Sequence, residues 1–368
     1  MIVIRLYKGD NLDIIPTIKE KPNIVYLDPP YNTKNSKLIY HDVFNNPNEW
    51  KEGFEKRVIE IKKIIQYKSV IYVSIGIEEL GNAKVVMDNV FGINSCVAVM
   101  PRRTCSTAKT TNRISKINDF VLVYVTGNIA FQKKAIDKSV YKLKDEHFEK
   151  RGFYHLRRLD YKDFLYSASS DFGIDYKGVT YYPSGDIQSW RDRKERHFLK
   201  DWCWLWSANK INFAIENDFI VFKNNRVYKK TYTNCKIDSE CKSNYKIVYE
   251  DRSQPISSID LLDKRFVGEN STKTETDSLF AYRKSNKLIK FLFELPILEH
   301  KVVLDPYAGS GVSAIISNEL GIDCILIQKS EKIKENKGRS ENFNYEDIFD
   351  ITKAILKERQ IEVDIINE

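Results

Sequence analysis

The stretch Val25-Tyr-Leu-Asp-Pro-Pro-Tyr-Asn-Thr33 begins like a buried strand and ends in an acid, two prolines and a tyrosine. Proline cannot donate to a strand ladder, and it pushes the residue before it out of helical geometry, so the strand formed by Ile24 to Leu27 must stop there. The pattern predicts a rigid turn that holds Asp28 and Tyr31 at a fixed separation. Ligands of open α/β sheets bind at this carboxyl end of the strands.

A second strand-to-helix junction lies near the other end of the chain, in Val302-Val-Leu-Asp-Pro-Tyr-Ala-Gly-Ser-Gly-Val-Ser313. A strand leads into a glycine turn and then into a helix, which lets a small ligand approach the helix amino end. A glycine turn that only relieves backbone strain is about as common. Ala314 replaces the last glycine of the pattern GxGxxG, and the Lys-Ser/Thr ending of a P-loop is missing, which disfavours dinucleotides and nucleoside triphosphates.

Hydrophobic patterning around the two junctions predicts an α/β domain that is split in two by an insertion. Before residue 131 we expect strands near residues 2–7, 24–27, 69–74, 96–100 and 120–126, and helices near 12–18, 50–66 and 78–89. After residue 265 we expect helices near residues 286–293 and 312–320, strands at 302–304 and 324–328, and an amphipathic stretch at 345–360. The predicted parts are therefore residues 1–130, 131–265 and 266–368.

The central part is rich in both positive charge and aromatic side chains. Residues 131–250 hold 24 Lys and Arg against 17 Asp and Glu, and 24 of the 45 aromatic residues. Basic side chains among aromatic ones suit a surface that binds a phosphate backbone and stacks on bases, although a β-rich domain with an aromatic core has the same composition. Phosphate contacts are predicted in a basic loop and in a charged run, at Arg102, Arg103, Arg191, Arg193 and Arg196.

Other classes of protein are disfavoured by the sequence. No apolar run approaches the roughly 18 residues of a membrane span, and the amino terminus has the pattern of a strand rather than of a signal peptide. The six cysteines form no CxxC pair and no HExxH spacing occurs, so we expect neither a metal site nor disulfides. The expected location is the cytoplasm.

The two junctions together resemble those of a known enzyme class. Asp305-Pro-Tyr-Ala-Gly-Ser-Gly311 is similar to the cofactor loop of S-adenosylmethionine-dependent amino-methyltransferases, and Asp28-Pro-Pro-Tyr31 is similar to their catalytic motif. Their order along the chain resembles the beta group of DNA amino-methyltransferases, and within it the modification (Mod) subunits of type III restriction-modification systems. This resemblance implies a doubly wound mixed sheet of the Rossmann-like methyltransferase type, with residues 131–265 as a target-recognition domain.

The resemblance also implies an activity, which is methylation of the N6 amino group of adenine in duplex DNA with S-adenosyl-L-methionine as cofactor. The target base would leave the helical stack to reach the enzyme. The implied catalytic residues are Asp28, Pro29, Pro30 and Tyr31, followed by Asn32 and Thr33 as substrate-binding residues. The implied cofactor-binding residues are Asp10, Lys284, Ser285, Asp305, Pro306, Tyr307, Ala308, Gly309, Ser310, Gly311 and Gln328.

Some positions depart from the family pattern. Gln328 stands where many cofactor-binding folds have an acid for the ribose hydroxyls, and Gly76 stands where an acid is expected, with Glu78 as its substitute. The chain is short beside type III subunits, which leaves open a homodimer, a restriction subunit as partner, or a solitary modifying enzyme. Methylation of cytosine N4, of RNA or of a protein amide are alternatives, as is a non-catalytic DNA-binding specificity module.

Overall fold

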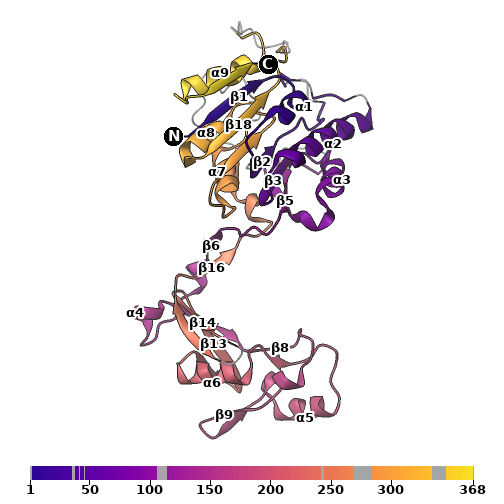
Figure 1. Ribbon diagram of the computed structural model, residues 1–368. Helices are drawn as coiled ribbons and strands as arrows, with labels where there is room; N and C mark the ends of the chain where they lie inside the picture. Colours follow the sequence, from indigo (N-terminus) through magenta and orange to yellow (C-terminus); the bar gives the residue numbers. More distant parts are fainter. Residues whose placement is uncertain are drawn as a thin grey trace. The chain divides into compact units, whose positions relative to one another are not determined.

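The computed structural model describes residues 2–34, 38–40, 42–44, 46–105, 114–241, 244–267, 283–333 and 345–367. The chain forms two compact units, one made of residues 1–132 and 256–368 and one made of residues 133–255. Each unit is drawn in Figure 1. The first unit is assembled from both ends of the chain, so its two junction sequences belong to a single body.

An eight-stranded sheet forms the centre of the first unit. Its strands lie in the order β19 (Asp364–Asn367), β1 (Ile4–Lys8), β18 (Asp323–Gln328), β17 (Val302–Asp305), β2 (Ile24–Leu27), β3 (Ser69–Ile75), β5 (Asn118–Thr126) and β4 (Cys96–Arg103). Neighbouring strands from β19 to β3 are parallel, whereas β5 is antiparallel to both β3 and β4. The sheet is therefore mixed, as predicted.

Helices cover both faces of this sheet, because alternate side chains of each strand point in opposite directions. Tyr26 packs in the core beneath α7 (Asn286–Glu294) and α8 (Val312–Leu320). Val25 and Leu27 pack in the opposite core, beneath α2 (Pro47–Ile64) and α3 (Leu80–Phe91). Figure 1 shows the two helix pairs on either side of the strands. This is the doubly wound architecture that the sequence predicted.

The remaining elements of the first unit close its edges. The short α1 (Asn11–Ile14) follows β1, and α9 (Ile348–Glu358) packs through Ile351 and Ile355 in a separate apolar cluster. After α9 the chain adds β19 parallel to β1, a strand that sequence patterning missed. Within the described residues, none of the helices has the length and apolar character that crossing a lipid bilayer requires.

The second unit is built from short antiparallel pieces. Its largest sheet has the order β12 (Ile220–Lys223), β13 (Arg226–Tyr232) and β7 (Tyr154–Arg158). The helix α6 (Ala208–Glu216) buries Ile211 and Ala214. The other pieces are the pairs β6 (Lys133–Ala135) with β16 (Ser253–Pro255), β8 (Asp160–Tyr161) with β11 (Cys203–Trp204), β9 (Ile174–Tyr176) with β10 (Val179–Tyr181) and β14 (Cys235–Ser239) with β15 (Tyr245–Tyr249), and the helices α4 (Phe148–Arg151) and α5 (Ile187–Glu195).

Candidate active site

The carboxyl ends of four neighbouring parallel strands, β1, β18, β17 and β2, open into one cavity of about 270 Å³. Both junction sequences contribute to its wall. Predicted site residues that line it are Asp10, Asp28, Pro29, Pro30, Lys284, Asp305, Pro306, Tyr307, Ala308, Gly309, Ser310 and Gln328. Apart from Tyr31, Ser285 and Gly311, which do not line the cavity, the predicted catalytic and cofactor-binding residues therefore meet in one place although up to 300 positions separate them.

Asp28 occupies the position directly after β2 and pairs with a cation from the far end of the chain. The Lys284 ammonium donates to Asp28 Oδ1 over 2.6 Å. Lys284 is nearly buried, with 9% of its side chain exposed, whereas Asp28 keeps 24%. One carboxylate oxygen of Asp28 is thus held by Lys284, and the position of the carboxylate is set by both chain segments of the first unit.

The turn after Asp28 is held rigid by its neighbours. The indole N–H of Trp50 donates to the Pro30 carbonyl over 2.7 Å. Tyr31 lies beside Lys284, whose ammonium is 4.8 Å from the ring centroid. Burial, and then the charge of Asp28, raise the pKa of Tyr31 well above its usual range, so the ring stays neutral. Within the part of the chain that the structure describes, the buried Tyr31 hydroxyl has no hydrogen-bond partner.

Gly76 is explained by its contact with Tyr31. A Cβ atom at Gly76 would lie 3.0 Å from Tyr31 Cδ2 and 2.8 Å from Glu78 Oε2. An acid at this position, which the family pattern led us to expect, would collide with the Tyr31 ring. Glu78 forms an ion pair with Lys116, with 2.8 Å between Lys116 Nζ and Glu78 Oε1.

Asn32 and Thr33 are tied back to a second acid, Asp42. The backbone N–H of Asn32 donates to Asp42 Oδ1 over 2.7 Å, and that of Thr33 donates to Asp42 Oδ2 over 2.9 Å. The Asn32 side chain also donates to Glu79 over 2.8 Å. These contacts fix the loop that follows the two prolines, and their role toward a substrate stays a prediction.

Asp305 organises the glycine loop from a buried position at the end of β17. Its carboxylate accepts the Tyr307 N–H over 3.0 Å and the Ser313 hydroxyl over 2.5 Å. Burial raises the pKa of Asp305 to about 7 against these two hydrogen bonds, and the charge of Asp28 adds to the rise. Asp305 therefore gains or loses a proton near neutral pH.

The glycine loop itself needs left-handed backbone, with φ of 50° at Gly309 and 68° at Gly311. Gly311 caps the start of α8. The Gly309 N–H donates to the Gln328 side chain over 2.8 Å, and the Gly309 carbonyl accepts from Thr352 over 2.6 Å. Gln328 thus anchors the loop through its side-chain oxygen, a contact that the comparison with acidic ribose-binding positions did not anticipate.

The cavity is also lined by Asp10 and by two residues that sequence analysis missed, Asn11 and Arg57. Asp10 caps α1 through the Leu12 N–H and pairs with Arg57 and Lys329, both at 3.0 Å. Burial would raise the pKa of Asp10, but these partners lower it below its usual value. Asn11 donates to the Pro306 carbonyl over 2.9 Å and so joins α1 to the glycine loop. Neither Asn11 nor Arg57 lies in a recognisable motif.

Ser285 and Gly311 complete the predicted set without belonging to the cavity wall. Ser285 precedes α7 and is buried, and its hydroxyl has no hydrogen-bond partner among the described residues. It neighbours Lys284 in sequence, so it lies next to the Asp28 ion pair. A buried hydroxyl without a partner is costly by about 1–3 kcal/mol unless a ligand or water satisfies it.

The prediction that Arg102 contacts DNA is wrong. Arg102 lies in β4 opposite Asp119 of β5, and its guanidinium donates twice to that carboxylate, at 2.7 and 2.5 Å. Only 6% of Arg102 is exposed. Removing one partner of a buried ion pair leaves an uncompensated charge, so Arg102 is committed to Asp119 at this edge of the sheet. Arg103 ends the strand half-buried, and residues 106–113 of the predicted basic loop lie outside the described residues.

The three arginines of the charged run have different environments. Arg191 and Arg196 are exposed on α5 and just after it. Arg193, in contrast, is 5% exposed and pairs with the buried Asp171 at 3.2 Å. It also donates to the Pro183 carbonyl over 2.9 Å. The prediction that Arg193 binds phosphate is therefore wrong, because helix periodicity turns it inward to satisfy a buried acid.

Replacing Arg193 with alanine is expected to destabilise the second unit by about 3 kcal/mol, because Asp171 would remain buried without its arginine. Lys194, 3.6 Å from Asp171, compensates only in part. Thermal unfolding of the full chain, with limited proteolysis to locate the loosened unit, measures this effect. The matched double variant Arg191→Ala/Arg196→Ala should unfold like the wild type, and equal destabilisation of both variants would contradict the assignment.

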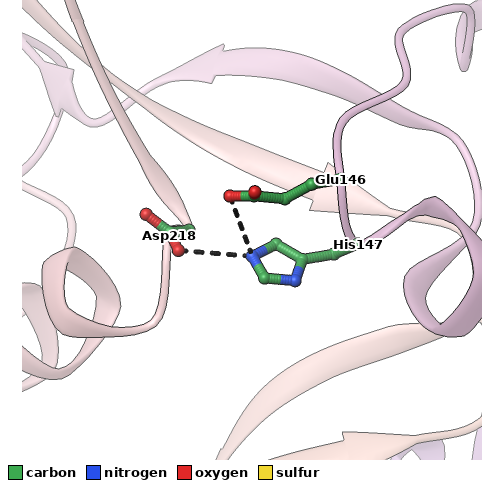
Figure 2. A group of neighbouring side chains, drawn as sticks. All are labelled: Glu146, His147 and Asp218. Carbon is green, nitrogen blue, oxygen red and sulfur yellow. Dashed lines mark hydrogen bonds and ion pairs between the residues drawn. The ribbon is translucent and has the colours of Figure 1, made fainter.

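Glu146, His147 and Asp218 gather in the second unit, as Figure 2 shows. His147 Nε2 lies 3.2 Å from Asp218 and 3.9 Å from Glu146. Both carboxylates are largely exposed and contact the same ring nitrogen. Arg151 also donates to the Asn217 carbonyl over 2.8 Å, so these contacts link α4 to the end of α6. We interpret the group as this structural link.

Comparison with known proteins agrees with the geometry of the cavity. Residues 23–337 match the N6/N4 DNA methylase family. The type II methyltransferase M.KpnI of Klebsiella pneumoniae is 27% identical over 84% of this chain and 75% of its own length. The EcoP15I Mod subunit, from a type III restriction-modification enzyme of Escherichia coli, is 23% identical over 95% of this chain and 62% of its own length.

Among solved structures, the cytosine-N4-specific PvuII DNA methyltransferase is 12% identical, with a TM-score of 0.45 over 98% of this chain and 94% of that one. The family match covers well over half of the chain and contains both junction sequences. It includes Asp28 after β2 and the loop from Asp305 to Gly311 after β17. The chain belongs to the N6/N4 DNA methylase family.

Proposed function

We propose that this DNA methylase transfers a methyl group from S-adenosylmethionine to the N6 amino group of adenine in duplex DNA, within a restriction-modification system. One observation carries the proposal. Asp28 with its prolines and the glycine loop of Asp305 line the same cavity, at the carboxyl ends of adjacent strands. A group that binds the amino nitrogen and a loop that binds a small cofactor are thus within reach of each other.

The residues of the cavity fit the cofactor of the family. When bound, S-adenosylmethionine supplies a methyl group activated by a positively charged sulfur. Besides Asp28, the cavity wall carries three acids that suit a ligand with a sulfonium and an ammonium group, namely Asp10, Asp305 and Glu331. It also carries four cations that suit the carboxylate of the same ligand, namely Arg57, Arg283, Lys284 and Lys329. The buried Ser285 hydroxyl adds a polar group that lacks a partner among the described residues. We assign the loop from Asp305 to Gly311, with Asp10, Lys284, Ser285 and Gln328, to cofactor binding.

Asp28 has the chemistry needed to activate an exocyclic amine. The lone pair of the adenine amino nitrogen is delocalised into the ring, which makes the nitrogen a poor nucleophile. A hydrogen bond from this amino group to the free oxygen of Asp28, and another to the Pro29 carbonyl, would draw the nitrogen toward tetrahedral geometry. The carboxylate also stabilises the positive charge that develops on nitrogen during transfer.

The surroundings of Asp28 support this role. Lys284 holds Asp28 Oδ1, and within the part of the chain that the structure describes no hydrogen bond occupies the second oxygen, which can accept a substrate N–H. Trp50 engages the Pro30 carbonyl, whereas among the described residues no hydrogen bond occupies the Pro29 carbonyl. Tyr31 offers a neutral ring next to Lys284, which suits stacking of an extruded base. The turn is thus prepared to accept two hydrogen bonds in a fixed direction.

Asp before Pro-Pro-Tyr, rather than Ser, favours adenine over cytosine as the target base. We assign residues 133–255 to DNA binding and target recognition. A restriction subunit is a further proposed partner, since the EcoP15I relative is named as the Mod subunit of a restriction-modification enzyme. A second copy of this chain is another proposed partner. The chain spans only 62% of that relative and 48% of the StyLTI Mod subunit of Salmonella typhimurium. The partners of those relatives are therefore carried over to this chain only as proposals.

The experiment that tests the proposal is methyl transfer from isotopically labelled S-adenosylmethionine to plasmid DNA, followed by mass spectrometry of the nucleosides. We expect labelled N6-methyl-2′-deoxyadenosine from the full chain, and sequencing of the modified DNA should place it in one recurring motif. Labelled N4-methyl-2′-deoxycytidine would instead identify cytosine as the target base. Absence of any labelled base, with cofactor binding intact, would support a non-catalytic specificity module instead.

A further inference from the structure

Four cations from distant parts of the sequence meet in the second unit. Arg157 lies on β7, Lys229 lies directly opposite it on β13, Lys210 lies on α6, and Arg252 follows β15. We call these four residues the cation cluster. Directly opposite residues of antiparallel strands project to the same face, so Arg157 and Lys229 share one face of the sheet. None of the four was singled out by a sequence motif.

The cation cluster has no carboxylate partner within the described residues. Other cations of the same unit do: Arg158 and Arg226 pair with Asp160, and Lys230 pairs with Asp145. Placing four like charges together without an acid opposes folding, because each repels the others. Such an arrangement is retained when a polyanion supplies the missing negative charge.

Lys229 shows how strongly the cluster is under-neutralised. Burial, followed by the charges of Arg157, Lys210 and Arg252, lowers the pKa of Lys229 to about 8. His155, on the same face of β7, responds in the same way: burial and the charges of Arg157, Arg252 and Lys229 lower its pKa. No acid contributes to either shift. Among the acids of this unit, Asp238 has its pKa lowered by the Ser239 N–H, by Lys236 and, behind these, by the charge of Lys210, but Asp238 contributes to neither the Lys229 nor the His155 shift.

Aromatic rings complete the surface. The ammonium groups of Lys210 and Lys229 each lie 5.0 Å from the centre of the Trp206 ring, and Lys210 lies 5.6 Å from that of Tyr245. The ring faces hold these cations without neutralising them, because a cation–π contact leaves the positive charge in place. The helix α6 begins just after Trp206, with Ser207 as its cap, so its first N–H groups add positive potential.

We propose that the cation cluster, together with Trp206, binds the sugar-phosphate backbone of duplex DNA. This inference rests on the proposed function, and it names the surface of the second unit that makes the electrostatic contact. It differs from the contact that the sequence predicted at Arg191 and Arg196, which lie on α5 and just after it rather than on the β7–β13 sheet. Each phosphate that approaches would offset the mutual repulsion of the four cations.

The first test is the salt dependence of DNA binding by the full chain, measured by fluorescence anisotropy with a random-sequence duplex. Each phosphate contact contributes about 0.9 to the slope of log affinity against log salt concentration. Lys210→Gln/Lys229→Gln should therefore make the slope shallower by about two units. The matched control Lys236→Gln/Lys246→Gln removes the same charge from β14 and β15, where both lysines pair with glutamates, and should keep the wild-type slope.

The second test measures proton uptake on DNA binding, with a variant that keeps the positive charge at position 229. At pH 8 about half of the Lys229 side chains are neutral, given a pKa of about 8. An approaching phosphate favours the ammonium, so DNA binding should take up about half a proton, measurable by calorimetry in buffers of different ionisation enthalpy. Lys229→Arg should keep affinity and salt slope but abolish the uptake, since arginine stays protonated.

The outcomes separate the two levels of the argument. If the wild type methylates DNA with a steep salt slope but Lys210→Gln/Lys229→Gln matches its control, and no proton uptake is seen, the cation cluster does not bind DNA and this inference is overturned alone. If the full chain shows neither salt-dependent DNA binding nor methyl transfer, the proposed function fails with it. Circular dichroism of each variant verifies the fold, and Lys229→Arg tests the proposal without neutralising any charge.

Discussion

Replacing Asp28 with alanine is expected to lower methyl transfer to DNA by about two to three orders of magnitude, the usual effect of removing one group that stabilises transition-state charge. Cofactor binding should stay close to that of the wild type, because the glycine loop is held by Asp305, Thr352 and Gln328 rather than by Asp28. Single-turnover transfer from labelled cofactor measures the first effect, and calorimetric titration with cofactor measures the second.

Two further variants make the interpretation of Asp28 specific. Asp28→Asn keeps the shape of the side chain and removes its charge, so it should lose nearly as much activity as alanine if the carboxylate charge is what matters. Asp323→Asn removes an acid from the amino end of β18, whereas the cavity lies at the carboxyl ends of the parallel strands, and should leave transfer unchanged. Equal loss of transfer and of cofactor affinity in Asp28→Ala would refute a role confined to the amino group.

Much of the sheet could be predicted because its strands are short apolar runs that end in residues incompatible with strands. Ile24 to Leu27 stops at two prolines, and Val302 to Asp305 stops at a proline and a glycine loop. These boundaries depend only on the backbone geometry of proline and glycine, so they can be read from the sequence without knowledge of the tertiary structure. The strand β19 was missed because Asp364–Asn367 is half polar and becomes a strand only by pairing with β1.

The errors at the site come from side chains whose environment is set by partners far along the chain. Arg102 and Arg193 have the composition expected of a DNA-binding stretch, yet each is buried against an acid that lies opposite it in space. The Lys284 pair with Asp28 spans 256 positions and has no local signature. Arg57 and Asn11 reach the cavity only because α1 and α2 pack on the same face.

The same physical reason hides the cation cluster. Arg157 and Lys229 are ordinary strand residues, and their proximity follows from the β7–β13 register rather than from spacing along the chain. Net charge indicated that the central part was basic, but it could not separate paired cations from unpaired ones. That distinction needs the positions of Asp145, Asp160 and Asp171 in the folded chain, because these acids pair with neighbouring cations. The four residues of the cation cluster are left without such a partner among the described residues.

The second large effect is expected at Asp305, whose replacement by alanine should weaken cofactor binding by about a hundredfold. The carboxylate accepts the Tyr307 N–H and the Ser313 hydroxyl, and so fixes both the start of the loop and the first turn of α8. Hydrogen bonds to a charged acceptor contribute about 1.5–3 kcal/mol each, and about 1.4 kcal/mol corresponds to a tenfold change in affinity. Calorimetric titration with S-adenosylmethionine measures the loss.

Asp305 should also make cofactor affinity depend on pH, in a direction that its environment fixes. Burial raises the pKa of Asp305 to about 7, well above its value of 3.8 in an unfolded chain. The folded protein therefore binds a proton there that the unfolded chain lacks between about pH 4 and 7, and the free energy of unfolding contributed by this group falls as pH rises through that window. A cationic ligand favours the ionised form, so affinity should rise through pH 7 with proton release.

Asp305→Asn separates charge from hydrogen bonding in this prediction. Asparagine keeps an acceptor for the Tyr307 N–H but does not titrate, so cofactor affinity should become independent of pH around 7 and binding should release no proton. Glu319→Gln removes an exposed acid from the same helix, α8, and should retain the wild-type pH profile. If Asp305→Asn still shows the rise in affinity through pH 7, Asp305 does not carry the effect and this prediction is refuted.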